Sequence, residues 1–136
     1  MPGLIIIKPF EAHFTTELKS SWELSPFCHF SMGEVEMTTD PCYRGGANPK
    51  WVKSIRMPIP VEESTCTLEI RDKDVLKDKD IGKCEIPLDE IIPQKNVRKW
   101  FKLKHENKEV GDILMEITYL EEDAWQLRRR AMSSIY

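Results

Sequence analysis

Four aspartates and three lysines share the ten-residue segment at positions 71–80. Carboxylate oxygens are the hard ligands that calcium prefers, and a calcium ion takes about six to eight oxygens, several of them anionic. The lysines weaken the attraction for a cation by a Coulomb repulsion that solvent only partly screens. Two interpretations stay open: the segment is a calcium-binding loop, or it is a solvated turn whose aspartates shape the backbone and pair with lysines.

No catalytic pattern accompanies these carboxylates. The three histidines, at positions 13, 29 and 105, are far apart in the sequence. Gly-x-Ser-x-Gly, phosphate-loop and His-Glu-x-x-His patterns are absent. The four cysteines are too sparse for a disulfide scaffold, and no pair has the Cys-x-x-Cys spacing of zinc sites, so we expect buried, reduced thiols. The sequence therefore predicts that the chain is not an enzyme.

The composition of the chain argues against some classes of binding partner. A chain of 136 residues with 40% hydrophobic and 32% charged residues fits one domain with its own core. A formal net charge of −3 argues against nucleic acid as a partner, so any attraction to acidic lipid must come from a local patch. The longest aliphatic run, at positions 4–7, is far shorter than the roughly 20 residues of a spanning helix. The start does not read as a signal peptide, and we expect a cytoplasmic protein.

The elements that must position the carboxylates are strands. Nine prolines interrupt the first 93 residues, and between them apolar and polar residues alternate. We expect strands at 3–14, 26–32, 51–59, 66–70, 84–88, 100–103 and 113–119, and a connection at 89–96 with at most one helical turn. Seven or eight such strands indicate an all-β fold, an eight-stranded antiparallel β-sandwich over residues 1–122. Its expected core comprises Trp51, Ile55, Leu68, Ile70, Ile86, Ile113, Met115 and Ile117.

The last residues, 123–136, follow a different pattern. They contain no Pro or Gly and place Trp125, Arg128, Met132 and Ile135 at helical spacing, with Arg129 and Arg130 beside this stripe. We predict a basic amphipathic tail or linker that suits a membrane surface or an acidic groove. The alternative is a helix that packs Trp125 on the sandwich.

Several short motifs occur in a suggestive order. Asn48-Pro49-x-Trp51 is followed by Asp72-x-Asp74, then Asp80-Ile81-Gly82 and Ile86-Pro87-Leu88, then Trp100-x-x-Leu103 and Gly111-Asp112-Ile113. This order resembles that of a C2 domain, the calcium- and phospholipid-binding sandwich, over residues 3 to about 120. Because the Gly111 segment comes last, the chain is similar to the second, permuted topology of the family. Ser25-Pro26-Phe27-Cys28 further resembles the C2 domain of calcium-independent protein kinase C.

The resemblance implies a calcium site at one end of the sandwich. Asp72, Asp74 and Asp80 match three of the five family aspartates. In the first loop, Ser25 stands where the family has a fourth, and the position of the fifth falls near Leu18 or Lys19. A site that lacks two of five carboxylates implies weak calcium binding or none, and the alternative of a solvated aspartate loop stays open.

The resemblance also implies contact with lipid. Trp22 and Leu24 in the first loop, and Val75 and Leu76 in the third, are candidates for membrane insertion, while Lys73, Lys77 and Lys79 would meet anionic headgroups. Alternatively, Trp22 or Leu24 folds back on the sandwich. Lys50, Lys53 and Arg56 are candidates for the family's basic face, although glutamates at 34 and 36 would repel phosphate there. The alternative is an ordinary solvated strand face.

These observations lead to two hypotheses. The first is a peripheral membrane module that binds anionic phospholipid with weak or no calcium dependence, motivated by the apolar loop residues and the nearby lysines. The second is a calcium-independent protein-interaction module of a larger signalling or trafficking protein, motivated by Ser25 in place of an aspartate.

Overall fold

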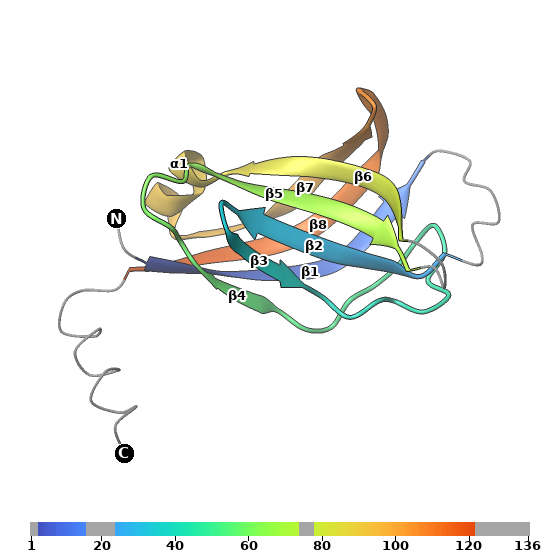
Figure 1. Cartoon of the computed structure of the whole chain (residues 1–136), viewed down its shortest axis with the longest axis horizontal. Helices are drawn as coiled ribbons and strands as arrows, with labels where there is room; N and C mark the ends of the chain where they lie inside the picture. The colour runs from blue at the N-terminus through green and yellow to red at the C-terminus, as the bar shows by residue number, and fades with distance from the viewer. Residues whose placement is uncertain (1–2, 16–23, 74–77, 122–136) are drawn as a thin grey trace, which may run out of the picture.

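The computed structural model describes residues 3–15, 24–73 and 78–121, and these form antiparallel β-strands with one short helical segment (Figure 1). The helical segment consists of α1, Leu88–Ile91, and the 3-10 turn η2, Ile92–Gln94. The strands are β1 Gly3–Phe14, β2 Pro26–Met32, β3 Val35–Thr38, β4 Ile55–Pro58, β5 Thr65–Asp72, β6 Lys79–Pro87, β7 Asn96–His105 and β8 Lys108–Glu121.

The strands form two packed layers. Their order is β3-β2-β5-β6-β7-β8-β1-β4, which folds over between β6 and β7. The described register at that point consists of one pair, Lys83 opposite Lys104, whereas β8 pairs along most of its length with both β7 and β1. We call β3-β2-β5-β6 the first layer and β7-β8-β1-β4 the second layer. This is the C2-like β-sandwich that the sequence predicts.

Period-two alternation places the core between the layers. Along β8, Ile113, Met115 and Ile117 are fully buried, while the residues between them are only half-buried. In β5, Leu68 and Ile70 are likewise fully buried. All eight residues that we expected in the core are buried: seven have the inward parity of their strands, and Trp51 lies before β4.

The strands differ from the expectation in several ways: β3 was not expected, and β6 begins at Lys79 rather than at position 84. A strand was expected at 51–59, but β4 begins only at Ile55 because the preceding residues turn toward β1 and β2: the Trp51 amide donates to the Phe10 carbonyl, and its indole Nε1 donates to the Pro26 carbonyl at 3.1 Å. Conversely, β7 and β8 extend well beyond the predicted 100–103 and 113–119. The predicted helical turn is present as α1 and η2.

Several strand ends meet at one end of the sandwich. β1 and β5 end, and β2 and β6 begin, at the end opposite α1, where the β3–β4 connection also lies (Figure 1). We call this the loop end. Within the described ranges, no helix has the length and apolarity that crossing a membrane requires.

Gly111 permits a close approach between β8 and β1. Its φ is +153°, and a Cβ at this position would collide with the carbonyl oxygen of His13. Residues with a side chain rarely adopt this backbone conformation. The Gly111-Asp112-Ile113 motif therefore has a steric role, since β8 pairs with β1 at this point.

We predict that Ile70→Asp abolishes folding. Ile70 is fully buried in β5, and an unpaired buried carboxylate is costly against a total stability of roughly 5–15 kcal/mol. Circular dichroism should show loss of the β-sheet spectrum. Val61→Asp is the matched control, because Val61 is 86% exposed, and it should retain the native spectrum. A native, cooperatively melting Ile70→Asp variant would contradict the placement of β5.

We predict that Gly111→Ala destabilises the domain by more than about 1 kcal/mol, since the native conformation is incompatible with a Cβ. Urea unfolding followed by intrinsic fluorescence measures the change. Asp112→Ala, at the neighbouring half-buried position, is the control and should cost less. Equal effects of the two substitutions would show that Gly111 carries no special steric constraint.

Candidate functional site at the loop end

Ser25 links the three connections of the loop end. Its backbone N–H donates to Oδ1 of Asp72 at 2.7 Å, and its carbonyl accepts the Lys73 N–H at 3.0 Å. Its hydroxyl accepts the backbone N–H of Arg44 at 3.1 Å. Ser25 is buried. One residue of the first connection is thus hydrogen-bonded to both of the others.

Further backbone hydrogen bonds anchor the second connection. The Cys42 N–H donates to the Pro26 carbonyl at 2.8 Å, and the Gly46 N–H donates to the Leu24 carbonyl at 3.1 Å. On the other side, the Phe14 N–H donates to the Ala47 carbonyl at 2.9 Å. The segment between β3 and β4 is therefore held against both ends of the first connection.

The expected calcium ligands Asp72 and Asp80 have different partners in the structure. Asp72 is engaged with the Ser25 amide, whereas Asp80 lies in β6 with its carboxylate 3.2 Å from Nε of Arg71. Asp74 lies outside the described residues. Among the residues that the structure describes, no three His, Cys, Asp or Glu side chains are grouped so that they could hold a metal ion. The three-aspartate site therefore stays a prediction.

Of the residues expected to insert into a membrane, the structure describes Leu24. Leu24 is only 8% exposed, so its side chain is buried in this structure, which favours the alternative that it folds back; its insertion into a membrane stays a prediction. The cause is that the backbone at 24–26 is bonded to the second connection, which places this side chain inward. Trp22, Val75 and Leu76 lie outside the described residues.

The expected basic residues are exposed but partly paired. Lys50, Lys53 and Arg56 are all exposed, and Lys53 lies 3.1 Å from a carboxylate oxygen of Asp40. Lys53 has the same parity as the buried Trp51 and Ile55, yet it is exposed because β4 has not begun at this position. Of the third-loop lysines, Lys73 lies 3.8 Å from Asp78 and Lys79 begins β6, while Lys77 is outside the described ranges.

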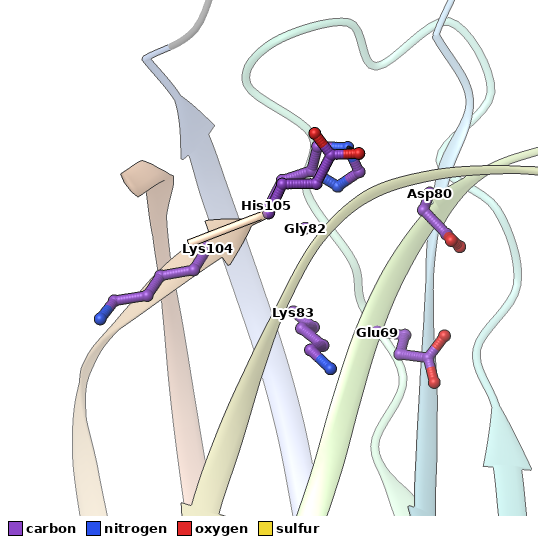
Figure 2. A pocket seen from close by; sticks show the side chains of 7 residues that line it. Glu69, Asp80, Gly82, Lys83, Lys104 and His105 are labelled. Atoms are coloured by element: carbon purple, nitrogen blue, oxygen red, sulfur yellow. Dashed lines mark ion pairs between the residues drawn. The ribbon is translucent and has the colours of Figure 1, made fainter. Parts of the chain in front are cut away.

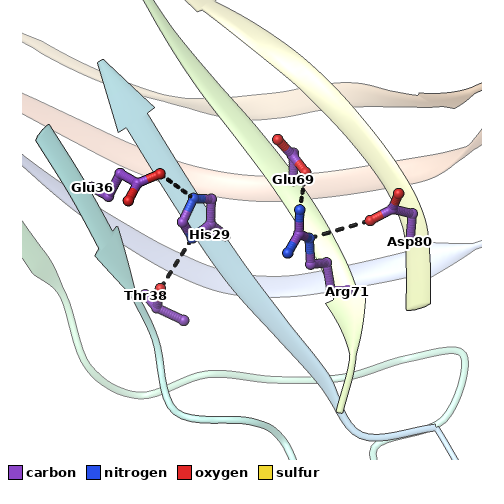
Figure 3. A network of polar contacts seen from close by, with 6 residues as sticks. All are labelled: His29, Glu36, Thr38, Glu69, Arg71 and Asp80. Atoms are coloured by element: carbon purple, nitrogen blue, oxygen red, sulfur yellow. Dashed lines mark hydrogen bonds and ion pairs between the residues drawn. The ribbon is translucent and has the colours of Figure 1, made fainter. Parts of the chain in front are cut away.

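The outer face of the first layer carries a polar network that the sequence did not reveal (Figure 3). Arg71 bonds Glu69 at 2.9 Å and pairs with Asp80. On the neighbouring strands, His29 lies 3.4 Å from a Glu36 carboxylate oxygen and 3.1 Å from the Thr38 hydroxyl. The network therefore makes this face rich in carboxylates.

A shallow hollow of about 210 Å³ lies beside this network, where β5, β6 and β7 come together. Figure 2 shows Asp80 and Glu69 on one side of it and Lys104 pointing away from them. Lys83, His105 and Glu106 complete the charged lining. Cations and carboxylates alternate here, so the hollow has no single charge preference.

The cysteine thiols are poor nucleophiles. Burial raises the pKa of Cys28, and it raises the pKa of Cys66 and of Cys84 to about 12. All four cysteines are free; Cys28 and Cys66 are buried as expected, whereas Cys42 and Cys84 are only half-buried. Since the thiolate is the reactive form, the three thiols with raised pKa values stay protonated and unreactive near neutral pH.

A comparison with protein-family profiles decides the family, because the C2 domain profile matches residues 5–103. The chain belongs to the C2 domain family. Among curated proteins, no sequence matches it significantly.

Solved structures agree with this C2 assignment. One C2 domain of plant extended synaptotagmin 1 is 16% identical, with a TM-score of 0.76 over 89% of this chain and 96% of that one. A C2 domain-containing protein is 14% identical, with a TM-score of 0.79 over 90% and 92% of the two chains. Human GIVD cytosolic phospholipase A2 is 18% identical, with a TM-score of 0.70, but the match covers 90% of this C2 domain and only 16% of that enzyme. Such identities establish the fold alone.

We predict that calcium binds this C2 domain with a dissociation constant above roughly 10⁻⁴ M, the weak end for protein sites. Ser25→Asp should lower the melting temperature in EDTA, since a second carboxylate would lie beside Asp72, and calcium should restore more stability to it than to the wild type. Calorimetry and thermal melts with and without calcium measure both effects. Ser25→Asn is the uncharged control. Micromolar affinity of the wild type would overturn the prediction.

Proposed function

We propose that this C2 domain is a non-catalytic module that docks on anionic phospholipid through its loop end, with weak or no dependence on calcium. The observation that carries the proposal is the hydrogen bond between the Ser25 amide and Asp72. It joins the start of β2 to the end of β5 directly, so this link does not depend on a metal ion.

The charge distribution supports docking through the loop end rather than through the first layer. On the outer face of that layer, Glu69 and Asp80 lie beside Arg71 and Glu36 lies beside His29, and these carboxylates repel lipid phosphate. The exposed cations of the loop end include Arg44, Lys50, Lys53 and Lys73. Cations near an anionic bilayer contribute about 1 kcal/mol each, and less where they are already paired, as Lys53 is with Asp40 and Lys73 with Asp78.

Residues of the third connection complete the proposed contact. Val75, Leu76 and Trp22 would enter the headgroup region, while Lys77 and Lys79 would meet phosphates. Arg56 lies farther along β4 and would strengthen the electrostatic attraction. Asp72, Asp74 and Asp80 would then supply at most a weak calcium site.

We also infer that the domain has the permuted C2 topology. The strand order supports this, because the last strand, β8, lies between β7 and β1 and the first strand is β1 at Gly3–Phe14. Relatedness to the C2 domain of calcium-independent protein kinase C stays a prediction that rests on Ser25-Pro26-Phe27-Cys28. Peripheral attachment to membranes from the cytoplasm is part of the same proposal.

We predict that the protein cosediments with vesicles containing phosphatidylserine, and not with neutral phosphatidylcholine vesicles, in EDTA as well as in calcium. Val75→Asp should reduce the bound fraction roughly tenfold, because it removes an apolar contact and adds a charge that anionic lipid repels. Val61→Asp carries the same charge change at the other end of the sandwich, between β4 and β5, and should bind like the wild type.

The outcomes separate the two hypotheses for this chain. Equal losses in both variants would show a general charge effect and contradict docking through the loop end. Binding that requires calcium would contradict the proposed calcium independence. Absence of binding to any vesicle would reject the membrane proposal and leave the protein-interaction module as the better hypothesis.

A further inference from the structure

The β3–β4 connection carries the most exposed aromatic side chain in the described part of the chain. Tyr43 is 74% exposed, whereas Trp100 is 45% exposed. A tyrosine combines an apolar ring with a polar hydroxyl, and such side chains are enriched at the boundary between a bilayer and water. Single apolar residues at a surface are common, so the position of Tyr43 and its neighbours decide whether it has a role.

Backbone hydrogen bonds place Tyr43 at the loop end. The Cys42 N–H donates to the carbonyl of Pro26, the first residue of β2, at 2.8 Å. The Gly45 N–H donates to the Cys42 carbonyl at 3.0 Å and closes a turn that contains Tyr43 and Arg44. Both of these side chains are exposed. The turn therefore presents an aromatic ring and a guanidinium group to solvent at the loop end.

The backbone of this turn is held in a conformation that few residues adopt. The φ of Arg44 is +56°, and residues other than glycine are uncommon in this left-handed region. The Ser25 hydroxyl accepts the Arg44 N–H at 3.1 Å, and Ser25 is buried. Because these bonds order the turn before any partner arrives, binding loses less conformational entropy than it would in a free loop.

The charge of Arg44 is available to a partner. Among the residues that the structure describes, no side chain forms an ion pair with the Arg44 guanidinium. Of the carboxylates in this region, Asp40 pairs with Lys53 at 3.1 Å, and Asp72 accepts the Ser25 amide. A guanidinium presents its N–H donors in a planar fork that matches phosphate. It therefore meets a phosphate without a bridging metal ion.

We propose that Tyr43 and Arg44 form a preordered membrane anchor on the β3–β4 connection. The Tyr43 ring enters the headgroup region, and the Arg44 guanidinium bonds the phosphate of an anionic phospholipid. The inference rests on the proposed docking through the loop end and assigns part of that contact to this turn. Because neither group is a carboxylate that needs a cation to meet phosphate, this contact is independent of calcium.

The chain offers a matched control for Arg44 at the other end of the sandwich. Lys95 is exposed, has a φ of +64° and follows η2 beside α1. Asparagine tolerates the left-handed region, so Arg44→Asn and Lys95→Asn each remove one positive charge at the same kind of backbone position. In vesicle cosedimentation with phosphatidylserine, Arg44→Asn should raise the dissociation constant about fivefold, the effect of one cation near an anionic surface. Lys95→Asn should bind like the wild type.

Substitution of Tyr43 separates the ring from the charge. Tyr43→Ala should weaken binding about fivefold, because it removes an apolar contact, and the loss should persist when the salt concentration is raised. Tyr43→Phe keeps the ring and should bind like the wild type. The effect of Arg44→Asn should instead shrink with salt, since salt screens exposed charges.

Val52→Ala is the control for Tyr43→Ala. Val52 is 84% exposed and belongs to the same connection. It follows Trp51, whose amide bonds the Phe10 carbonyl, and β1 continues from there to Phe14 at the loop end. Val52 is therefore set back from the loop end, and its substitution should leave binding unchanged. All these side chains are exposed, so the melting temperature of every variant should stay near that of the wild type.

The outcomes distinguish this anchor from the proposed function on which it rests. Wild-type binding that neither Tyr43→Ala nor Arg44→Asn weakens would overturn the anchor and leave docking through other loop-end residues standing. Equal losses in Arg44→Asn and Lys95→Asn would show a general charge effect and also overturn the anchor. Absence of wild-type binding to any vesicle would reject the anchor and the proposed function together. Calorimetry with inorganic phosphate should show no binding; binding that Arg44→Asn abolishes would assign the turn to a free anion and overturn the membrane anchor.

Discussion

The buried backbone N–H of Ser25 requires an acceptor, and the structure supplies it with the carboxylate of Asp72. A buried amide without a partner would cost about 1–3 kcal/mol, so this bond fixes the start of β2 relative to the end of β5. The Ser25 carbonyl and hydroxyl then hold Lys73 and Arg44. Protein groups thus supply direct links among the described parts of these loops. Asp72 also has one oxygen fewer to offer to calcium, which is consistent with weak metal binding.

The outer faces of the two layers differ in polarity. On the first layer, Arg71 lies between Glu69 and Asp80, and a salt-bridged face of this kind needs no covering. On the second layer, Trp100 and Leu120 remain partly exposed beside half-buried aliphatic residues. The contrast arises in the sequence, since β5 alternates core residues with Thr and Glu whereas β1 has aliphatic residues at both parities from Leu4 to Ile7.

Sequence patterns predicted the core because burial follows parity. Ile70 and Ile117 could be placed from alternation alone, and so could the sandwich. Alternation fails where tertiary hydrogen bonds override it: the strand expected at 51–59 is shortened by the bonds of Trp51. The burial of Leu24 could not be predicted, because the sequence does not reveal that the Gly46 amide donates a hydrogen bond to the Leu24 carbonyl. Asp80 pairs with Arg71, since the register of β5 and β6 sets these residues opposite each other.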